Sequence, residues 1–232
     1  MESLIKSNIY RILHYKKAIK GSIFGVIFVT LINIIDIMLE AEGLNNIKGN
    51  DYLNDFFGSE LILIYLAVIV TVLCSKGIND KTINYETING YKWHEILFSR
   101  IITISIFQII LIFFVQSLAF VVLSLVNGYG GQISIFWVYL EELLVLLSFV
   151  IVFIVSELIF QKTMIAAVIS VLLVIISSIG NNEGTGWKPL AFYNLSYNAS
   201  LKNSLIDFVM LIGIIILFYY ISLFIWNRRK KG

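Results

Sequence analysis

The chain has 232 residues, of which 59% are hydrophobic and only 14% are charged, and its mean hydropathy is +0.89. Soluble domains have about 45–50% apolar and about 25% charged residues, so this composition excludes an ordinary soluble domain. The formal net charge of +2 does not indicate a nucleic-acid partner. With one cysteine and two isolated histidines, the sequence offers no internal disulfide and no metal site.

The apolar residues are gathered into six runs, each near the length of a membrane span. A helix rises about 1.5 Å per residue and the hydrocarbon core is about 30 Å thick, so about 20 apolar residues cross it. We therefore predict an all-α polytopic membrane protein that forms one domain over residues 1–232. The six predicted transmembrane helices are 21–38, 60–76, 97–126, 133–158, 162–180 and 204–226.

Residues 1–20 predict a further helix before the first span. Ile5, Ile9, Ile12 and Leu13 fall on one helical face, with basic residues between them. A basic amphipathic helix beside a span usually lies in the interface of the cytoplasmic leaflet. We interpret this segment as an interfacial anchor, and the alternative is that it transmits motion from a partner.

The positions of Lys and Arg predict the topology. If both termini are cytoplasmic, fourteen of the seventeen basic residues lie inside, and only Lys48, Lys188 and Lys202 lie outside. An excess of positive charge in cytoplasmic loops is the usual orientation signal. We therefore expect a multi-pass protein of a cell membrane with cytoplasmic N- and C-termini. Its many Ile and Asn residues indicate a bacterial source.

Acidic residues are concentrated on the predicted outer side of the membrane. They are Asp36, Glu40, Glu42, Asp51, Asp55, Glu60, Glu141, Glu142, Glu183 and Asp207. Ordinary solvation of the loops accounts for them. The alternative is an outer surface that attracts a cationic ligand such as a basic peptide.

One polar segment separates the second and third predicted spans. Residues 81–100 read KTINYETINGYKWHEILFSR and include five charged residues. Thr82 is suited to begin a short helix and Gly90 to end it, and a second helix then runs into the third span. A simple connection needs only about two to eight residues. We therefore interpret residues 77–96 as a folded cytoplasmic docking loop, with an amphipathic loop resting on lipid headgroups as the alternative.

This segment resembles the loop between the second and third spans in permease subunits of type-2 ABC exporters. That loop has a coupling helix ending in Gly, then a basic residue, an amphipathic turn and another basic residue. The matching residues are Lys81, Thr82, Ile83, the run to Asn89, Gly90, Lys92, Ile96 and Arg100. The chain is similar in architecture to the small six-span permeases of lantibiotic and bacteriocin immunity and of peptide export. It differs at Lys92, where the family often has Arg, and at Trp93 and His94, where small polar residues are common.

The resemblance implies that a separate ABC ATPase docks on the loop. Closure of two ATPase subunits would reorient the spans of two paired permeases, which are identical or sister chains. No G-x-x-x-x-G-K-[ST] phosphate loop occurs in the sequence, so we expect no enzymatic activity here, with ATP and Mg²⁺ bound to the ATPase. The residues expected to contact that subunit are Ile83, Tyr85, Glu86, Ile88, Gly90 and Lys92.

Polar residues in or beside the apolar runs are candidates for a substrate path: Asp36, Gln108, Gln116, Glu141 and Glu142. The two glutamines share a helical face, where they either bond a neighbouring helix or line a path. A charge at the bilayer centre costs on the order of 2.5–3.5 kcal/mol. Either the fourth span begins after the glutamate pair, or the carboxylates face a cavity. No Arg follows the pair as it does in membrane-embedded proteases of bacteriocin immunity, so we expect no intramembrane enzyme.

The sequence thus predicts a permease that moves a peptide, such as a bacteriocin or lantibiotic, out of the membrane or cell. Within the same mechanism, the cargo is alternatively a drug, a lipid or a sodium ion. A non-transporting membrane scaffold or sensor is the alternative from another class. The expected partners are an ABC ATPase, a second permease, membrane lipid and a cationic peptide.

Overall fold

The computed structural model describes residues 2–40, 48–49, 52, 60–79, 86–130, 135–160, 162–181, 209, 212–213, 216–221 and 223–224. Its helices are α1 (Glu2–His14), α2 (Lys16–Glu40), α4 (Glu60–Asn79), α6 (Trp93–Asn127), α7 (Ile135–Phe160) and α8 (Thr163–Asn181). The described part of the chain contains no β-strand. The prediction of an all-α fold is confirmed for these residues.

Three helices are long and apolar enough to cross a membrane, through the segments Lys16–Leu39, Trp93–Asn127 and Glu142–Phe160. Two further apolar helices, Glu60–Ser75 and Thr163–Ile176, are shorter. The described residues therefore carry the first five predicted spans as helices. Most of the sixth, 204–226, lies outside the described residues. The structure thus supports a membrane protein, and the count of six spans stays a prediction.

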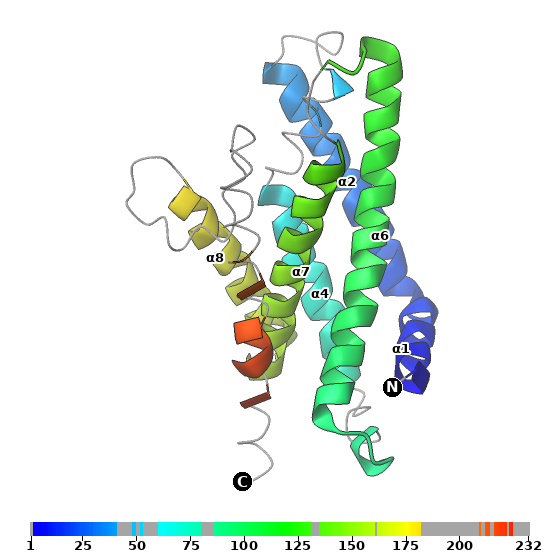
Figure 1. Cartoon of the computed structure of the whole chain (residues 1–232), viewed down its shortest axis with the longest axis vertical. Coiled ribbons are helices and arrows are strands. Elements are labelled where there is room, and N and C mark those ends of the chain that lie inside the picture. The colour runs from blue at the N-terminus through cyan, green and yellow to red at the C-terminus, as the bar shows by residue number, and fades with distance from the viewer. Residues whose placement is uncertain are drawn as a thin grey trace.

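The long helices pack side by side into a bundle (Figure 1). Helix α4 is central, because it contacts α2, α6, α7 and α8. Helix α6 packs on α1, α2, α4 and α7, with the short helix α1 beside its N-terminal half. In Figure 1, α2 crosses behind α6 and begins next to the end of α1.

The amphipathic helix predicted at 1–20 is shorter than expected, because the chain changes direction at Tyr15. The backbone N–H of Tyr15 lies 3.1 Å from the Arg11 carbonyl oxygen and 3.0 Å from that of Ile12, which closes α1. The Tyr15 carbonyl then accepts the N–H groups of Ala18 and Ile19, which start α2. Basic residues continue through the joint, so the sequence pattern alone does not show it. Residues 16–20 therefore form the base of the first span.

A glycine sets the distance between α2 and α4. A Cβ atom added at Gly25 would lie 2.5 Å from Cε2 of Tyr65, whereas one at Gly21 would have no atom within 4 Å. Small residues let membrane helices approach closely. Of the two glycines, Gly25 is therefore the one that the packing within this chain requires.

Candidate functional site

Residues 86–92 form a capped helical turn that leads into α6. Residues 86–88 are helical, and Gly90 has a φ angle of +84°. The N–H of Tyr91 donates to the Glu86 carbonyl at 3.2 Å, and the N–H of Gly90 donates to the Thr87 carbonyl at 3.1 Å. These two bonds form a Schellman motif, in which glycine takes the left-handed conformation without strain. Gly90 therefore ends the short helix, as the sequence predicts.

Helix α6 begins immediately after this turn. The Glu95 carboxylate accepts a hydrogen bond of 2.8 Å from the backbone N–H of Lys92, the residue that precedes the helix. A negative charge in the first turn also interacts favourably with the helix dipole. The connection between the turn and the long helix is thus short and hydrogen-bonded.

Glu86 is buried between two arginines that come from different helices. Its Oε1 lies 3.0 Å from Nη2 of Arg11 in α1, and its Oε2 lies 3.2 Å from Nη2 of Arg100 in α6. Removing one partner of a buried ion pair leaves an uncompensated charge, which is strongly destabilising. The carboxylate of Glu86 therefore joins α1, the turn and α6 into one unit.

Two further hydrogen bonds attach α1 to the same region. Asn8 Nδ2 donates to Ser99 Oγ at 2.9 Å in a buried contact, and the hydroxyls of Ser3 and Tyr91 lie 2.7 Å apart. Together with the ion pair of Arg11, these contacts are spread over most of the length of α1. They join residues 75 to 91 positions apart in the sequence.

The structure separates the predicted docking residues into two groups. Glu86 is buried, so it does not have the exposed position that a contact residue needs. Ile88 is 79% exposed, and Asn89, Gly90 and Lys92 are also exposed. We refer to Ile88, Asn89, Gly90 and Lys92 as the exposed tip. Ile83 and Tyr85 lie outside the described residues.

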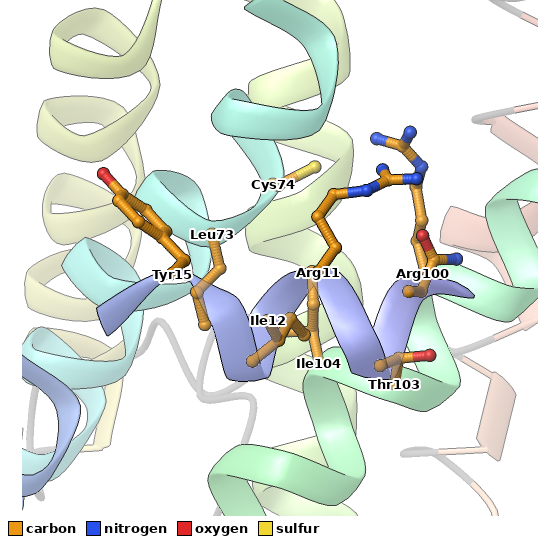
Figure 2. A pocket seen from close by; sticks show the side chains of 9 residues that line it. Arg11, Ile12, Tyr15, Leu73, Cys74, Arg100, Thr103 and Ile104 are labelled. Atoms are coloured by element: carbon orange, nitrogen blue, oxygen red, sulfur yellow. The ribbon is translucent and has the colours of Figure 1, made fainter. Parts of the chain in front are cut away.

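A small cavity lies where α1, α4 and α6 meet (Figure 2). Arg11 and Arg100 line it with their guanidinium groups close together, and Cys74 of α4 lies beside them. Its volume of about 30 Å³ gives room for one or two water molecules. The cavity is therefore too small for a transported peptide.

Gln108 and Gln116 are buried and bind side chains of α2. Gln108 Nε2 donates to Ser22 Oγ at 3.2 Å, and Gln116 Nε2 donates to Thr30 Oγ1 at 2.9 Å. Each pair is 86 residues apart, which shows that α2 and α6 run parallel in a constant register. The structure therefore shows both glutamines in hydrogen bonds to a neighbouring helix.

Two tyrosines complete these polar contacts. The Tyr65 hydroxyl lies 3.0 Å from both Gln108 Oε1 and the Ser22 carbonyl oxygen, and the Tyr52 hydroxyl donates to Gln116 Oε1. Burial raises the pKa of the Tyr52 phenol, so this group remains a neutral donor. Each glutamine is thus bonded through both its amide nitrogen and its amide oxygen.

The remaining predicted path residues are Asp36, Glu141 and Glu142. Helix α7 runs from Ile135 to Phe160 without a break at the glutamate pair, and Glu142 is buried inside the bundle. The side chain of Glu141 lies outside the described residues. Asp36 is exposed on the last turns of α2. Of the described side chains, Glu142 is therefore inside the bundle, and Asp36 is on the surface.

Sequence reasoning did not single out Asn8 and Arg11, although both carry the contacts of α1. Leu4, Asn8, Arg11 and Tyr15 follow each other at intervals of three or four residues, which is one helical face. Attention to this mixed stripe, beside the more obvious apolar one, would have found them.

No protein-family model matches the chain, and no curated protein matches it either.

Proposed function

We propose that the chain is the permease subunit of an ATP-driven ABC exporter, and that the exposed tip docks a separate ATPase subunit. The observation that carries this proposal is the exposed Ile88 on a turn that Glu86 fixes to α1 and α6. A short helix with an exposed apolar anchor suits insertion into a groove of a partner. Movement of the docked tip would reach α6 directly, because Gly90 and Lys92 lead into that helix.

The proposed orientation puts the exposed tip in the cytoplasm, where an ATPase has access to ATP. Since α2 and α6 run parallel, Lys16, Lys17 and Lys20 lie at the same end of the bundle as Lys92 and Arg100. A concentration of positive charge at one end favours the cytoplasmic side. This sidedness supports the assignment of the N-terminus to the inside of a bacterial cell membrane, and six spans would return the C-terminus to the same side.

The cargo and the assembly follow from the resemblance. We propose six spans, pairing with a second identical or sister permease, and export of a peptide such as a bacteriocin or lantibiotic. An acidic outer side would favour a cationic peptide, and Asp36 and Glu60 are exposed on described helices. ATPase activity stimulated by such a peptide in the reconstituted complex separates a transporter from a scaffold or sensor. A drug, a lipid or sodium as the stimulating molecule would keep the mechanism and change the cargo.

Co-purification tests the docking site. The chain is expressed in turn with each ABC ATPase subunit of its source bacterium, and capture of the ATPase is measured. Ile88→Asp should abolish capture without lowering the yield of the chain, because Ile88 is largely exposed to solvent and its loss leaves no cavity. A charge at the centre of a docking groove typically costs several kcal/mol of binding free energy.

Leu125→Asp is the matched control. Leu125 is an equally exposed apolar residue (81% against 79% for Ile88), and it lies in the last turn of α6, at the opposite end of that helix from the exposed tip. This variant should capture the ATPase as the wild type does. Capture by Ile88→Asp at the wild-type level would refute the docking site, and a wild-type chain that binds no ATPase would refute the permease function.

A further inference from the structure

An apolar groove lies between α1 and α6, next to the small cavity of Arg11 and Arg100, with which it shares Ile12 and Thr103. Its volume is about 320 Å³. One wall is formed by Ile5, Ile9, Ile12 and Leu13, and the other by a face of α6 from Thr103 to Phe114. Thr103 is the one polar residue in the lining, and its hydroxyl already donates to the Ser99 carbonyl at 2.6 Å. The groove therefore has an uncharged, hydrocarbon-like surface.

Helix α1 turns two different faces to its surroundings. The mixed stripe with Leu4 and Asn8 is buried against the protein, whereas Ile9 and Leu13 of the apolar stripe stay exposed beside the groove. An amphipathic helix in a soluble domain would bury the apolar stripe. The reversed arrangement places that stripe where hydrocarbon surrounds the protein.

The dimensions of the groove match one leaflet of a bilayer. From Thr103 to Phe114 the axis of α6 rises by about 16 Å, which is about half of a 30 Å hydrocarbon core. Ile106, Ile110 and Phe114 on this face are exposed, and they belong to a helix that is long and apolar enough to cross a membrane. The open side of the groove therefore faces acyl chains.

Positive charge lies at the end of α1 that borders the groove. Lys16, Lys17 and Lys20 are exposed, and among the described residues they form no ion pair. Lys17 is four residues from Leu13, which limits their separation to about 14 Å. Each basic residue near a membrane surface adds roughly 1 kcal/mol of attraction to anionic lipid.

We propose that this groove binds an anionic phospholipid of the leaflet in which α1 lies. One acyl chain fills the groove between α1 and α6, and the phosphate group interacts with Lys16, Lys17 and Lys20. The lipid would thus hold the outer face of α1 against α6, while Glu86 holds the inner face. This inference depends on the membrane location of the chain and is independent of ATPase docking.

The experiment measures lipid retained by the purified chain. The protein is reconstituted in vesicles of equal amounts of phosphatidylglycerol and phosphatidylcholine, extracted with mild detergent, and analysed by native mass spectrometry. The wild type should retain one phosphatidylglycerol per chain, in about tenfold excess over phosphatidylcholine, because three lysines attract the anionic headgroup. No retained lipid, or equal retention of the two lipids, would overturn the proposal.

Two sets of variants separate the acyl chain from the headgroup. Ile110→Trp fills the groove and should lower retention by about tenfold, because the displaced chain loses its apolar contacts. Val122→Trp is the control, since Val122 is equally exposed on α6 (58% against 63%) but does not line the groove. Replacing Lys16, Lys17 and Lys20 with Gln should remove the preference for phosphatidylglycerol, whereas Lys6→Gln should keep it.

Equal losses in the two tryptophan variants would overturn the assignment of the chain to the groove. Retention of the preference after the triple substitution would overturn the assignment of the headgroup. A disulfide-linked dimer formed through Ile110→Cys would also overturn the proposal, since it would show that a second copy of the chain covers the groove.

Discussion

The most apolar stretches of α6 and α7 have nearly the same mean hydropathy, yet the two helices are buried to very different extents. In the most apolar stretch of α7, 78% of the residues are buried, against 22% in that of α6. Helix α7 is held by close packing of apolar side chains such as Leu146, Val150 and Phe153. The buried residues of α6 include Ser99, Arg100, Gln108 and Gln116, and they bond to α1, to the turn before α6 and to α2.

The difference follows from the solvent. In a bilayer, exposing an apolar side chain on the protein surface costs little free energy, because lipid tails are as apolar as a protein core. Hydropathy therefore indicates which helices are apolar enough to cross a membrane, but it does not indicate which of them lie at the centre of the bundle. Polar contacts join α6 to α1, α2 and α7, whereas most of the buried side chains of α7 are apolar.

A pair of phenylalanine substitutions tests this comparison with the largest expected effect. Phe153→Ala in α7 should lower the free energy of unfolding by about 3–5 kcal/mol, because a buried aromatic ring leaves a cavity and Phe153 is 0% exposed. Phe114→Ala in α6 should cost less than about 1 kcal/mol, since lipid replaces a side chain that is 62% exposed. Reversible unfolding by SDS in mixed micelles measures both, and equal costs would contradict the comparison.

Breaking the ion pairs of Glu86 should have the next largest effect. Glu86→Gln should cost about 3 kcal/mol, because the buried Arg100 and the partly buried Arg11 lose their counter-charge. Glu2→Gln, at the exposed pair of Glu2 with Lys6 (2.7 Å), should cost less than about 0.5 kcal/mol. The same unfolding assay measures both variants. If the two substitutions cost the same, Glu86 does not join α1 to α6 as described.

The two glycines of α2 test the close contact with α4. Gly25→Ala should cost about 1–3 kcal/mol, because the added methyl group meets the hydrogen-bonded ring of Tyr65. Gly21→Ala should be neutral or slightly stabilising, since alanine favours a helix and nothing lies within 4 Å. The free energy of unfolding of each variant, measured in the same mixed micelles, tests this difference. A neutral Gly25→Ala would show that Tyr65 moves freely.

The hydrogen bond between Gln108 and Ser22 should have the smallest effect. A double-mutant cycle of Gln108→Leu and Ser22→Ala should give a coupling energy of about 0.6 kcal/mol, typical of polar contacts between membrane helices. Unfolding free energies of the wild type, the two single variants and the double variant supply the cycle. A coupling energy of zero would mean that the register of α2 and α6 does not depend on this bond.

Much of the local structure was predictable. The first five apolar runs are helices within a few residues of their predicted bounds, and Gly90 ends its short helix as expected. The exposed position of Ile88 also agrees with a docking loop. The prediction of Glu86 as a partner contact did not anticipate its burial, because its partner Arg11 is held near it only by the packing of α1 on α6.

The sequence by itself determined what depends on length, polarity and local backbone preference: apolar helices, their ends, and a polar segment between two of them. Only the tertiary structure decided which faces meet. Arg11 reaches Glu86 across 75 residues, and Gln108 reaches Ser22 across 86. In a membrane, hydropathy cannot rank the faces of an apolar helix, since lipid and protein are equally good surroundings for it. The small number of buried polar groups therefore determined the arrangement around α6, and packing determined that around α7.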